Sequence, residues 1–417
     1  MSSPELAAPQ GGQKGGRQAG FAFIFALALM NSISFGIMIP ILPNLIREMT
    51  GGDTAAAADW NVLFATTWGV MQFVCGPILG MFSDRFGRRP VLLLSLLGLG
   101  IDFLFMAFAP TLWWLLVGRI LNGATAASFS TANAYLADVT APAERAKVFG
   151  WMGSAFSFGF IIGPTLGGFL GEYDLRLPFL VAAAITFINV AYGYFILPES
   201  LPPERRAKAY DWRRANPIGA LKLLRSKVGL LPLASVGFLY QIAHVVLPTI
   251  FVLYTTHRYG WSPGFLGLTF LLTGVLGVLV QIFLVGPTVR RLGERRTMFI
   301  GLTAGAIGFA WYGWAPDGWL YLIGTPIFAL SGFIMPGLQG LMTRKVEPQE
   351  QGQLQGANQS LSGIGSMVGP ALFGLVFAES LRRGWPEGMA IYLAAGLLVL
   401  AMGLAAMAAR AAGPAKT

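Results

Sequence analysis

Two ionisable residues, Asp102 and Arg119, lie well inside apolar runs of this 417-residue chain. A charged side chain near the middle of a bilayer costs about 2.5–3.5 kcal/mol on insertion scales, so we expect neither residue to face lipid. Both should face the interior of one helical bundle, close enough to pair. Movement of either residue would then load or release a proton. A static, structural ion pair is the alternative interpretation.

A second candidate for proton chemistry is His244, which follows Gln241 by three residues in another apolar run. Residues three apart share a helix face, so the imidazole and the amide should act together. Histidine titrates near neutral pH, which suits proton coupling or hydrogen bonding to a substrate. A buried histidine whose hydrogen bonds are satisfied within the protein is the competing interpretation.

The segment GMFSDRFGRRP, residues 80–90, joins two apolar runs in a short turn. Asp84 falls at the C-terminal end of a helix, the unfavourable end for an anion. We therefore hypothesise that Asp84 latches a cytoplasmic gate by binding the start of the helix that begins near Gln353; a loop that only sets topology is the alternative. The predicted gate residues are Gly80, Asp84, Arg85, Gly87, Arg88 and Arg89.

Glycine and proline cluster again in GFIIGPTLGG, residues 159–168. Gly159, Gly163 and Gly167 are four apart and lie along one helix face, where a neighbouring backbone can approach closely. Pro164 interrupts the helical hydrogen bonds, and Gly168 ends the cluster. The combination favours a gating element over a generic packing face.

Scattered amide and aromatic side chains inside the apolar runs predict a large, mainly apolar cavity with a few directing polar groups. The candidate substrate-binding residues are Asn31, Gln72, Asn122, Phe156, Phe238, Gln241, His244, Gln281, Trp311, Gln339 and Asn358. Cys75 is the single cysteine, so neither a disulfide nor a thiolate metal site can form. We expect no metal and no cofactor.

The elements that must position these residues are membrane-spanning helices. Hydrophobic residues make up 55% of the chain, charged residues 12%, and the mean hydropathy is +0.62. Each crossing takes about 20 apolar residues as a helix, and continuously apolar runs exclude a β-barrel. The twelve predicted spans are 20–46, 58–80, 89–109, 111–137, 147–171, 177–197, 228–256, 262–287, 297–315, 318–342, 353–380 and 386–409.

The formal charge of +10 would suit a nucleic-acid partner, but the basic residues gather in alternate loops. This is the positive-inside pattern, which predicts that both termini are cytoplasmic and that the basic loops face the inner leaflet. We expect no nucleic-acid partner. The loops leave no room for a catalytic domain and contain no GxxxxGK[ST] motif, so we predict neither an enzyme nor an ATP-driven pump.

An internal repeat divides the chain. GPTVRRLGERR begins at Gly286, 206 residues after Gly80, and other Gly and Pro pairs keep that offset. The expected domains are a disordered tail (1–19), a six-helix bundle (20–198), a linker (199–227), a second six-helix bundle (228–410) and a short tail (411–417). Residues 212–224 fit either a surface helix or a solvated tether. The repeat is imperfect, since Arg290 stands at the Asp84 position and Gly308 at the Asp102 position.

These motifs resemble those of the major facilitator superfamily. GMFSDRFGRRP is similar to its signature loop, GRILNGATAA to its helix-four motif, and GFIIGPTLGG to the helix-five motif of its antiporters. YLADVTAPAERAKVFG and QGQLQG extend the likeness to the bacterial tetracycline/proton antiporter group. The resemblance implies an all-α membrane protein with twelve helices in two pseudo-symmetric bundles, and export of a drug in exchange for protons. It assigns Asp102 to the helix-three carboxylate and Gln281 to the substrate path.

Three departures from that group alter the expected chemistry. Asn31, Gly277 and Gly305 stand where the tetracycline exporters have a helix-one aspartate, a helix-eight histidine and a helix-nine aspartate. The sequence therefore favours another small amphiphilic substrate over metal-chelated tetracycline, with proton coupling left to Asp102, Arg119 and His244. We expect a monomer in the bacterial inner membrane. A metabolite facilitator or exporter without proton coupling, and a non-transporting sensor or scaffold, are the rival functions.

Overall fold

The chain is described by a computed structural model that covers residues 11–140, 144–206, 224, 229–347 and 350–411. Within these residues the secondary structure is helical throughout. The N-terminal half contains α1 (Gly11–Met38), α2 (Leu42–Met49), α3 (Thr54–Phe86), α4 (Arg88–Phe108), α5 (Leu112–Thr125), α6 (Ser128–Val139), α7 (Arg145–Gly171), α8 (Leu177–Ile196) and the short η2 (Pro203–Arg205). The expected surface helix at 212–224 lies outside the described residues except for Leu224.

The C-terminal half contains α10 (Leu230–His244), α11 (Val246–Tyr259), α12 (Pro263–Leu279), η3 (Val280–Leu284), α13 (Val285–Trp314), α14 (Gly318–Ala329), η4 (Leu330–Phe333), α15 (Ile334–Thr343), α16 (Gln351–Arg383) and α17 (Met389–Ala411). The helix α1 begins at Gly11, earlier than the expected boundary at residue 20, so part of the tail expected to be disordered is helical.

Ten helical stretches in the described part of the chain are long and apolar enough to cross a membrane. One of them, Pro263–Trp314, turns at Gly293, where the backbone is not helical, and so covers two predicted spans. The predicted span 111–137 is covered by the shorter helices α5 and α6. Each of the twelve predicted spans therefore has a helical counterpart, and the protein is a multi-pass membrane protein.

Several spans are broken where a proline removes a backbone donor. In a continuous helix the backbone nitrogen of residue 248 would donate to the His244 carbonyl, but Pro248 has no N–H, and α10 ends at His244. In the same way, Pro336 follows the 3₁₀ turn η4, and Pro287 follows the π-helical turn η3. A proline interrupts the helical ladder and also clashes with the carbonyl four residues earlier. These breaks place polar residues at irregular turns within the membrane.

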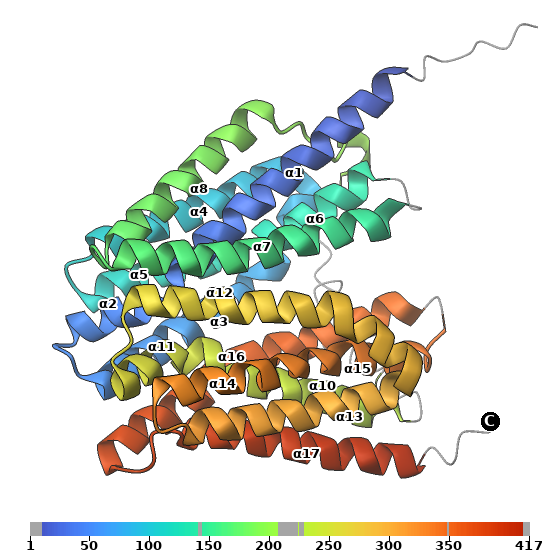
Figure 1. Ribbon diagram of the computed structural model, residues 1–417. Coiled ribbons are helices and arrows are strands. Elements are labelled where there is room, and N and C mark those ends of the chain that lie inside the picture. The colour runs from blue at the N-terminus through green and yellow to red at the C-terminus, as the bar shows by residue number, and fades with distance from the viewer. Residues whose placement is uncertain (1–10, 141–143, 207–223, 225–228, 348–349, 412–417) are drawn as a thin grey trace, which may run out of the picture.

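The two halves form two bundles that lie side by side (Figure 1). Long helices of opposite halves make the seam between them: α7 runs along α12, and α3 packs against α16. The small residues Gly168 and Gly267 lie in this seam, where a Cβ at Gly168 would come within 2.8 Å of the Gly267 Cα. At this point of the seam, α7 and α12 are packed at backbone distance.

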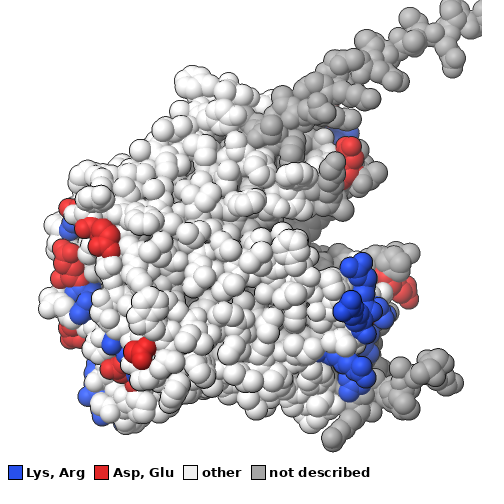
Figure 2. Space-filling view, in the orientation of Figure 1, with Lys and Arg blue, Asp and Glu red and all other residues white. Residues whose placement is uncertain are grey.

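Charged side chains gather at two opposite ends of the molecule, with an uncharged band between them (Figure 2). One end carries mostly Lys and Arg in this view and the other carries both signs. We call them the basic end, which holds the turns at Gly87 and Gly293, and the mixed-charge end, which holds the turns at Gly52, Gly260 and Gly384. An uncharged band between two charged ends is the surface expected of a membrane-spanning body.

Candidate functional site

The expected pair of Asp102 and Arg119 is present in the core of the N-terminal bundle. Asp102 on α4 is 0% exposed and Arg119 on α5 is 4% exposed. The carboxylate forms an ion pair with the guanidinium, whose Nε also donates to Oδ1 over 3.3 Å. Asn122 Nδ2 donates to Oδ2 over 2.7 Å. A buried carboxylate with this many donors is stabilised in its charged form as long as the donors stay in place.

The network extends from Asn122 to the seam between the halves. Trp68 Nε1 on α3 donates to Asn122 Oδ1 over 3.3 Å, so the amide is bonded on both sides and is 5% exposed. The neighbouring Gly69 faces the other half, where its Cβ position lies 3.8 Å from Met367 Cα on α16. Asn122 joins the interface helix α3 to the buried carboxylate, and its role in substrate binding stays a prediction.

Close approach of α4 and α5 makes the network possible. A Cβ at Gly118 would lie 2.6 Å from Asp102 Oδ1 and 3.0 Å from Phe105 Cβ. Any larger residue at this position would push the carboxylate away from Arg119, because a Cβ contact under 3.0 Å cannot be accommodated without movement. Gly118, the first glycine of the GRILNGATAA segment, thus allows Asp102 to lie close to Arg119.

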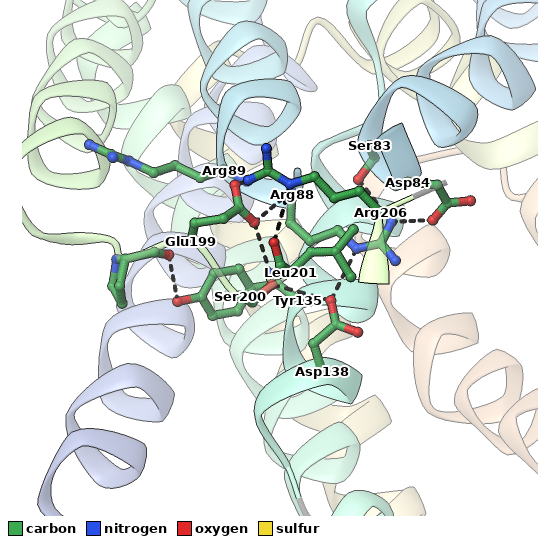
Figure 3. Close-up of polar contacts among 11 residues, drawn as sticks. Ser83, Asp84, Arg88, Arg89, Tyr135, Asp138, Glu199, Ser200, Leu201 and Arg206 are labelled. Carbon is green, nitrogen blue, oxygen red and sulfur yellow. Dashed lines mark hydrogen bonds and ion pairs between the residues drawn. The ribbon is translucent and has the colours of Figure 1, made fainter. Parts of the chain in front are cut away.

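The turn between α3 and α4 is shaped by Gly87 and held by Glu199 (Figure 3). Gly87 has φ 110°, a conformation that residues with a Cβ rarely adopt, and its Cβ position would lie 2.6 Å from Glu199 Cδ. The Glu199 carboxylate accepts from the backbone N–H of Arg88 over 2.8 Å and of Arg89 over 3.2 Å. It also accepts from Leu201 N over 3.0 Å. A carboxylate on the first N–H groups of a helix satisfies orphan donors and complements the helix dipole.

Arg88 connects the turn to the end of α6. Its guanidinium donates to Asp84 Oδ1 over 2.5 Å, to Asp138 Oδ2 over 3.1 Å and to Ser83 Oγ over 3.2 Å. Ser200 also donates to Asp138, and Tyr135 donates to the Pro198 carbonyl over 2.9 Å (Figure 3). Asp84 itself is 56% exposed and contacts Arg88. Among the described residues, the contact given for Asp84 is with Arg88, and the predicted latch to the start of α16 stays a prediction.

The repeat copy of this turn preserves the geometry and reverses the charges. Gly293, 206 positions after Gly87, also has a positive φ, of 76°. Glu294 stands at the Arg88 position and Arg344 at the Asp138 position, and these two side chains form an ion pair. A salt bridge therefore ties the first turn to the end of α6 and the second turn to the end of α15. The positive and negative partners are exchanged between the two halves.

The glycines of α7 serve two partners. Gly163 and Gly159 face α1, where their Cβ positions would lie 2.7 Å from the Gly36 Cα and 2.9 Å from the Ser32 carbonyl carbon. Pro164 lies on this face as well, since a Cβ at Gly36 would come within 2.9 Å of its Cδ. Gly167 packs on Ile37 of α1, and Gly168 packs on α12 of the other half. The motif thus holds one helix of its own bundle and one across the seam at backbone distance.

A narrow cleft lies in the C-terminal bundle between α10, α15 and α16. Four of the predicted substrate-binding residues line it: Phe238, Gln241, Gln339 and Asn358. His244 lies on α10 one turn beyond Gln241, and its ring stacks with Tyr240 at 5.4 Å and Phe328 at 5.9 Å between centroids. The expected neighbourhood of His244 and Gln241 is therefore present, although the histidine belongs to an aromatic stack beside the cleft.

The other candidate residues are not brought to this cleft. Trp311 donates its indole N–H to the Leu320 carbonyl over 2.7 Å and packs on Trp314. Asn31 Oδ1 is buried without a hydrogen-bond partner on α1. Gln72, Phe156 and Gln281 are exposed elsewhere on α3, α7 and η3. The remaining gate residues lie at or near the turn between α3 and α4. Arg85 is partly exposed beside Phe86, and Arg89 donates to the Tyr194 carbonyl. A side chain at Gly80 would project into open space.

Two functional candidates escaped the sequence analysis, Glu199 and Asp138. Glu199 directly follows the sixth span in LPES and was assigned to the linker by its composition. Its signal was a carboxylate just beyond a span end, next to Pro198, at the start of a mostly basic region. Asp138 sits one residue before the end of α6, and only the pairing of α6 with the turn identifies its partner.

Polar contacts join the halves at the mixed-charge end. His257 Nδ1 on α11 lies 3.4 Å from Thr54 Oγ1 on α3. Asn61 donates to the Thr249 carbonyl over 2.8 Å, and Gly264 N donates to Glu172 over 2.7 Å. Arg382 on α16 forms an ion pair with Asp59 on α3. These contacts close the seam at this end of the molecule.

Comparison with known proteins agrees with this architecture. The family model described as Major Facilitator Superfamily matches residues 24–370 and, in a second match, residues 233–416. The chain is 37% identical to the class C tetracycline resistance protein of Escherichia coli, over 89% of this chain and 93% of the relative. It is 30% identical to multidrug resistance protein 2 of Bacillus subtilis, over 85% and 88%.

Solved structures give the same fold. The nucleoside transporter NupG superposes with a TM-score of 0.73 at 15% identity, over 93% of this chain and 98% of that one. The human organic anion transporter MFSD10 gives a TM-score of 0.66 at 24% identity, over 93% and 99%. Two bundles with repeat-related turns, and a family match over most of the sequence, lead to one conclusion: this chain belongs to the Major Facilitator Superfamily.

Proposed function

We propose that this protein is a secondary active transporter that exports small amphiphilic, drug-like compounds in exchange for protons. Transport proceeds by alternating access, in which the two bundles rock about the seam and expose a central cavity to each side in turn. The proton gradient supplies the energy. The protein works in a bacterial inner membrane, with the basic end in the cytoplasm.

One observation carries the coupling part of this proposal. The chain of hydrogen bonds from Trp68 through Asn122 to Asp102 links a helix of the seam to a buried carboxylate. When the bundles move, α3 moves relative to α16, and the Asn122 donor moves relative to Asp102. A carboxylate that loses a donor in a dry core binds a proton more readily. Movement of the halves and protonation of Asp102 are thereby linked.

Drug export is supported by two relatives whose names describe resistance to tetracycline and to multiple drugs. Tetracycline itself is a weaker candidate for this chain. Asn31, Gly277 and Gly305 are uncharged; Gly277 has open space where a side chain would project, and Gly305 packs against Leu398. The described residues contain no cluster of His, Cys, Asp and Glu that could hold a metal ion. A substrate carried as a metal chelate does not suit such a site.

The test is a flux measurement in proteoliposomes that contain the purified full chain and a pH-sensitive dye. Substrate added on one side should drive a pH change that stops when an ionophore collapses the gradient. Liposomes with Asp102→Asn protein should show no pH change. Substrate movement with an unaltered internal pH would establish the uncoupled facilitator instead. Absence of both fluxes for every compound in a varied panel would favour the sensor or scaffold.

A further inference from the structure

The cleft of the C-terminal bundle is lined by amides and apolar side chains. Its polar lining consists of the amides Gln241, Gln339 and Asn358 and the hydroxyl of Ser362. The remaining lining residues are apolar, and Phe238, Met335 and Met342 supply the larger surfaces. None of the lining residues carries an ionisable side chain. A bound molecule therefore meets hydrogen-bonding groups and apolar walls, without a counter-ion.

Asn358 provides an unused donor at this cleft. Its Nδ2 is buried and has no hydrogen-bond partner. A buried donor without an acceptor is unfavourable, so a ligand that brings an acceptor gains more here than at a satisfied amide. The Gln339 amide, by contrast, is partly engaged, since its Oε1 accepts from Gln355 Nε2 over 3.4 Å. The acceptor of a ligand should therefore be directed to Asn358.

The surroundings of Gln241 position a second amide on the opposite wall. Gln241 lies on α10, and Gly365 of α16 gives it room, because a Cβ at Gly365 would come within 3.2 Å of the Gln241 Cγ. Methionine and phenylalanine side chains on the same walls adapt to flat apolar groups of different shapes. The cleft thus combines two amides on facing helices with an adjustable apolar surface.

These features separate ligands by charge. A carbonyl or ether oxygen can accept from Asn358 and leave its apolar frame against Phe238. A quaternary cation would lose its hydration in the cleft and find no carboxylate to replace it. The buried acid of the N-terminal bundle, Asp102, is already paired with Arg119. We propose that this cleft selects uncharged amphiphiles that present a carbonyl oxygen, and that it discriminates against permanent organic cations. The inference rests on the proposed function as an exporter.

Binding to the purified full chain in detergent, without a gradient, tests the inference. Chloramphenicol serves as the uncharged carbonyl probe and tetraphenylphosphonium as the permanent cation, each followed by quenching of tryptophan fluorescence. Wild-type protein should bind chloramphenicol at least tenfold more tightly than the cation. Asn358→Leu should weaken chloramphenicol binding about tenfold. Asn358→Asp should reverse the preference by creating the missing counter-ion.

The adjacent Gln359 gives a matched control, because it is exposed on α16 and does not line the cleft. Gln359→Leu and Gln359→Glu should leave both affinities unchanged. If Asn358→Asp protein is unstable, Gln241→Glu places a carboxylate on the facing wall and should produce the same reversal. Equal wild-type affinity for the two probes would overturn the inference, as would cation binding that responds to Gln359→Glu as strongly as to Asn358→Asp.

The outcome is separable from that of the proposed function. Selective chloramphenicol binding with no associated proton flux in proteoliposomes would uphold the cleft and refute antiport. Proton flux driven by tetraphenylphosphonium, with no binding of the uncharged probe, would uphold antiport and refute the selectivity. Each pair of results decides both questions.

Discussion

The cores of the two bundles can be compared position by position through the 206-residue offset. Asp102, Arg119 and Asn122 of the first half correspond to Gly308, Thr325 and Phe328 of the second. The contacts are equivalent: Asn122 bonds to Asp102, and a Cβ at Gly308 would lie 2.9 Å from the Phe328 Cα and Cβ. The crossing of α4 and α5 in the first half holds an ion pair, and the equivalent crossing of α13 and α14 in the second half holds the ring of Phe328.

The second half shows that the fold does not require charge at this crossing. Replacing a buried ion pair with well-packed apolar groups is often neutral or stabilising. The second half builds the same helix crossing in that way, since Phe328 packs on Phe309 and Tyr312. The repeat therefore acts as an internal control, and it supports our proposal that the charged network of the first half serves transport rather than stability.

The basic-end turns give a second, contrasting comparison. Both turns keep an ion pair to the fourth helix, but Arg88 with Asp138 becomes Glu294 with Arg344. Coulomb attraction is unchanged when both signs are exchanged. The pairs thus have a structural role that tolerates reversal. Asp84 is different, because its counterpart is Arg290 and the latch predicted for Asp84 needs a negative charge.

The largest effect is expected from Asp102→Asn, which removes the charge that the second half lacks. Proton-coupled efflux should be abolished, because Asn cannot exchange a proton. The single variant leaves Arg119 buried and unpaired, which costs about 3–5 kcal/mol. Asp102→Asn combined with Arg119→Gln should recover stability and still fail to couple. Efflux is measured in inverted vesicles, and thermal unfolding is followed in detergent.

The single and double variants test whether the charged core of the first half has a role beyond packing. If the uncharged double variant regains proton-driven efflux, the charged core is only one structural solution among two, and the proton site lies elsewhere. Thermal stability of the double variant below that of the single variant would show that the N-terminal crossing depends on charge after all.

Asp84→Asn should have the next largest effect, on transport rather than on stability. The predicted latch to α16 requires a negative charge, so we expect efflux to fall about tenfold, a loss of about 1.4 kcal/mol in the transition state for switching. The matched variant is Arg290→Gln in the copy, where an exposed arginine has no corresponding task. Equal losses from the two variants, in whole-cell efflux at matched expression, would mean that the turns are functionally symmetric.

The fold was largely predictable from the sequence because membrane insertion requires long apolar runs, and the repeat shows how they pair. The charge asymmetry was also visible, since Asp102 and Arg119 are conspicuous in apolar surroundings. Their pairing could be anticipated on energetic grounds, because two isolated buried charges would be far more costly than a buried pair. The breaks within the spans are caused by Pro248, Pro287 and Pro336. A span predicted from apolar composition alone is drawn as one continuous helix and does not show such a break.

The sequence did not predict which polar side chains face a cavity, because that depends on the rotation of each helix about its axis and on its depth in the membrane. Asn122 and Trp311 have the composition of cavity residues, but one faces Asp102 and the other a carbonyl at the mixed-charge end. Glu199 has the sequence context of a linker residue, and only the folded chain places its carboxylate against the turn at Gly87. Helix phase within a bundle is set by packing against several neighbours at once, and an apolar sequence in lipid carries little signal of which face is buried.

Glu199→Gln should lower both thermal stability and efflux moderately. Glutamine can still accept from Arg88 N, but it loses the charge that complements the start of α4. Loss of a helix cap of this kind costs about 0.5–2 kcal/mol. We expect a thermal midpoint lower by about 1–4 °C and reduced efflux at unchanged expression. The exposed Glu204 of η2 provides the control, and Glu204→Gln should change neither quantity.

A cap that served stability alone would lower the midpoint and leave efflux per molecule intact. That result would remove Glu199 from the gate and reduce its role to anchoring the linker. Greater loss of efflux than of stability would instead join the linker start to the gate of the first half, for which Glu294 and Arg344 offer no equivalent.

The smallest effect is expected from reversing the ion pair of the second turn. Arg344 is 70% exposed, and an exposed pair contributes about 0–1 kcal/mol. Glu294→Arg places two cations together and should lower the thermal midpoint slightly. Adding Arg344→Glu copies the polarity of Arg88 with Asp138 and should restore both midpoint and efflux. Because attraction does not depend on which partner is positive, a double variant that stays as impaired as Glu294→Arg would contradict the tolerance for reversal. The polarity itself would then be part of the mechanism, and the turns would differ in function as deeply as the cores do.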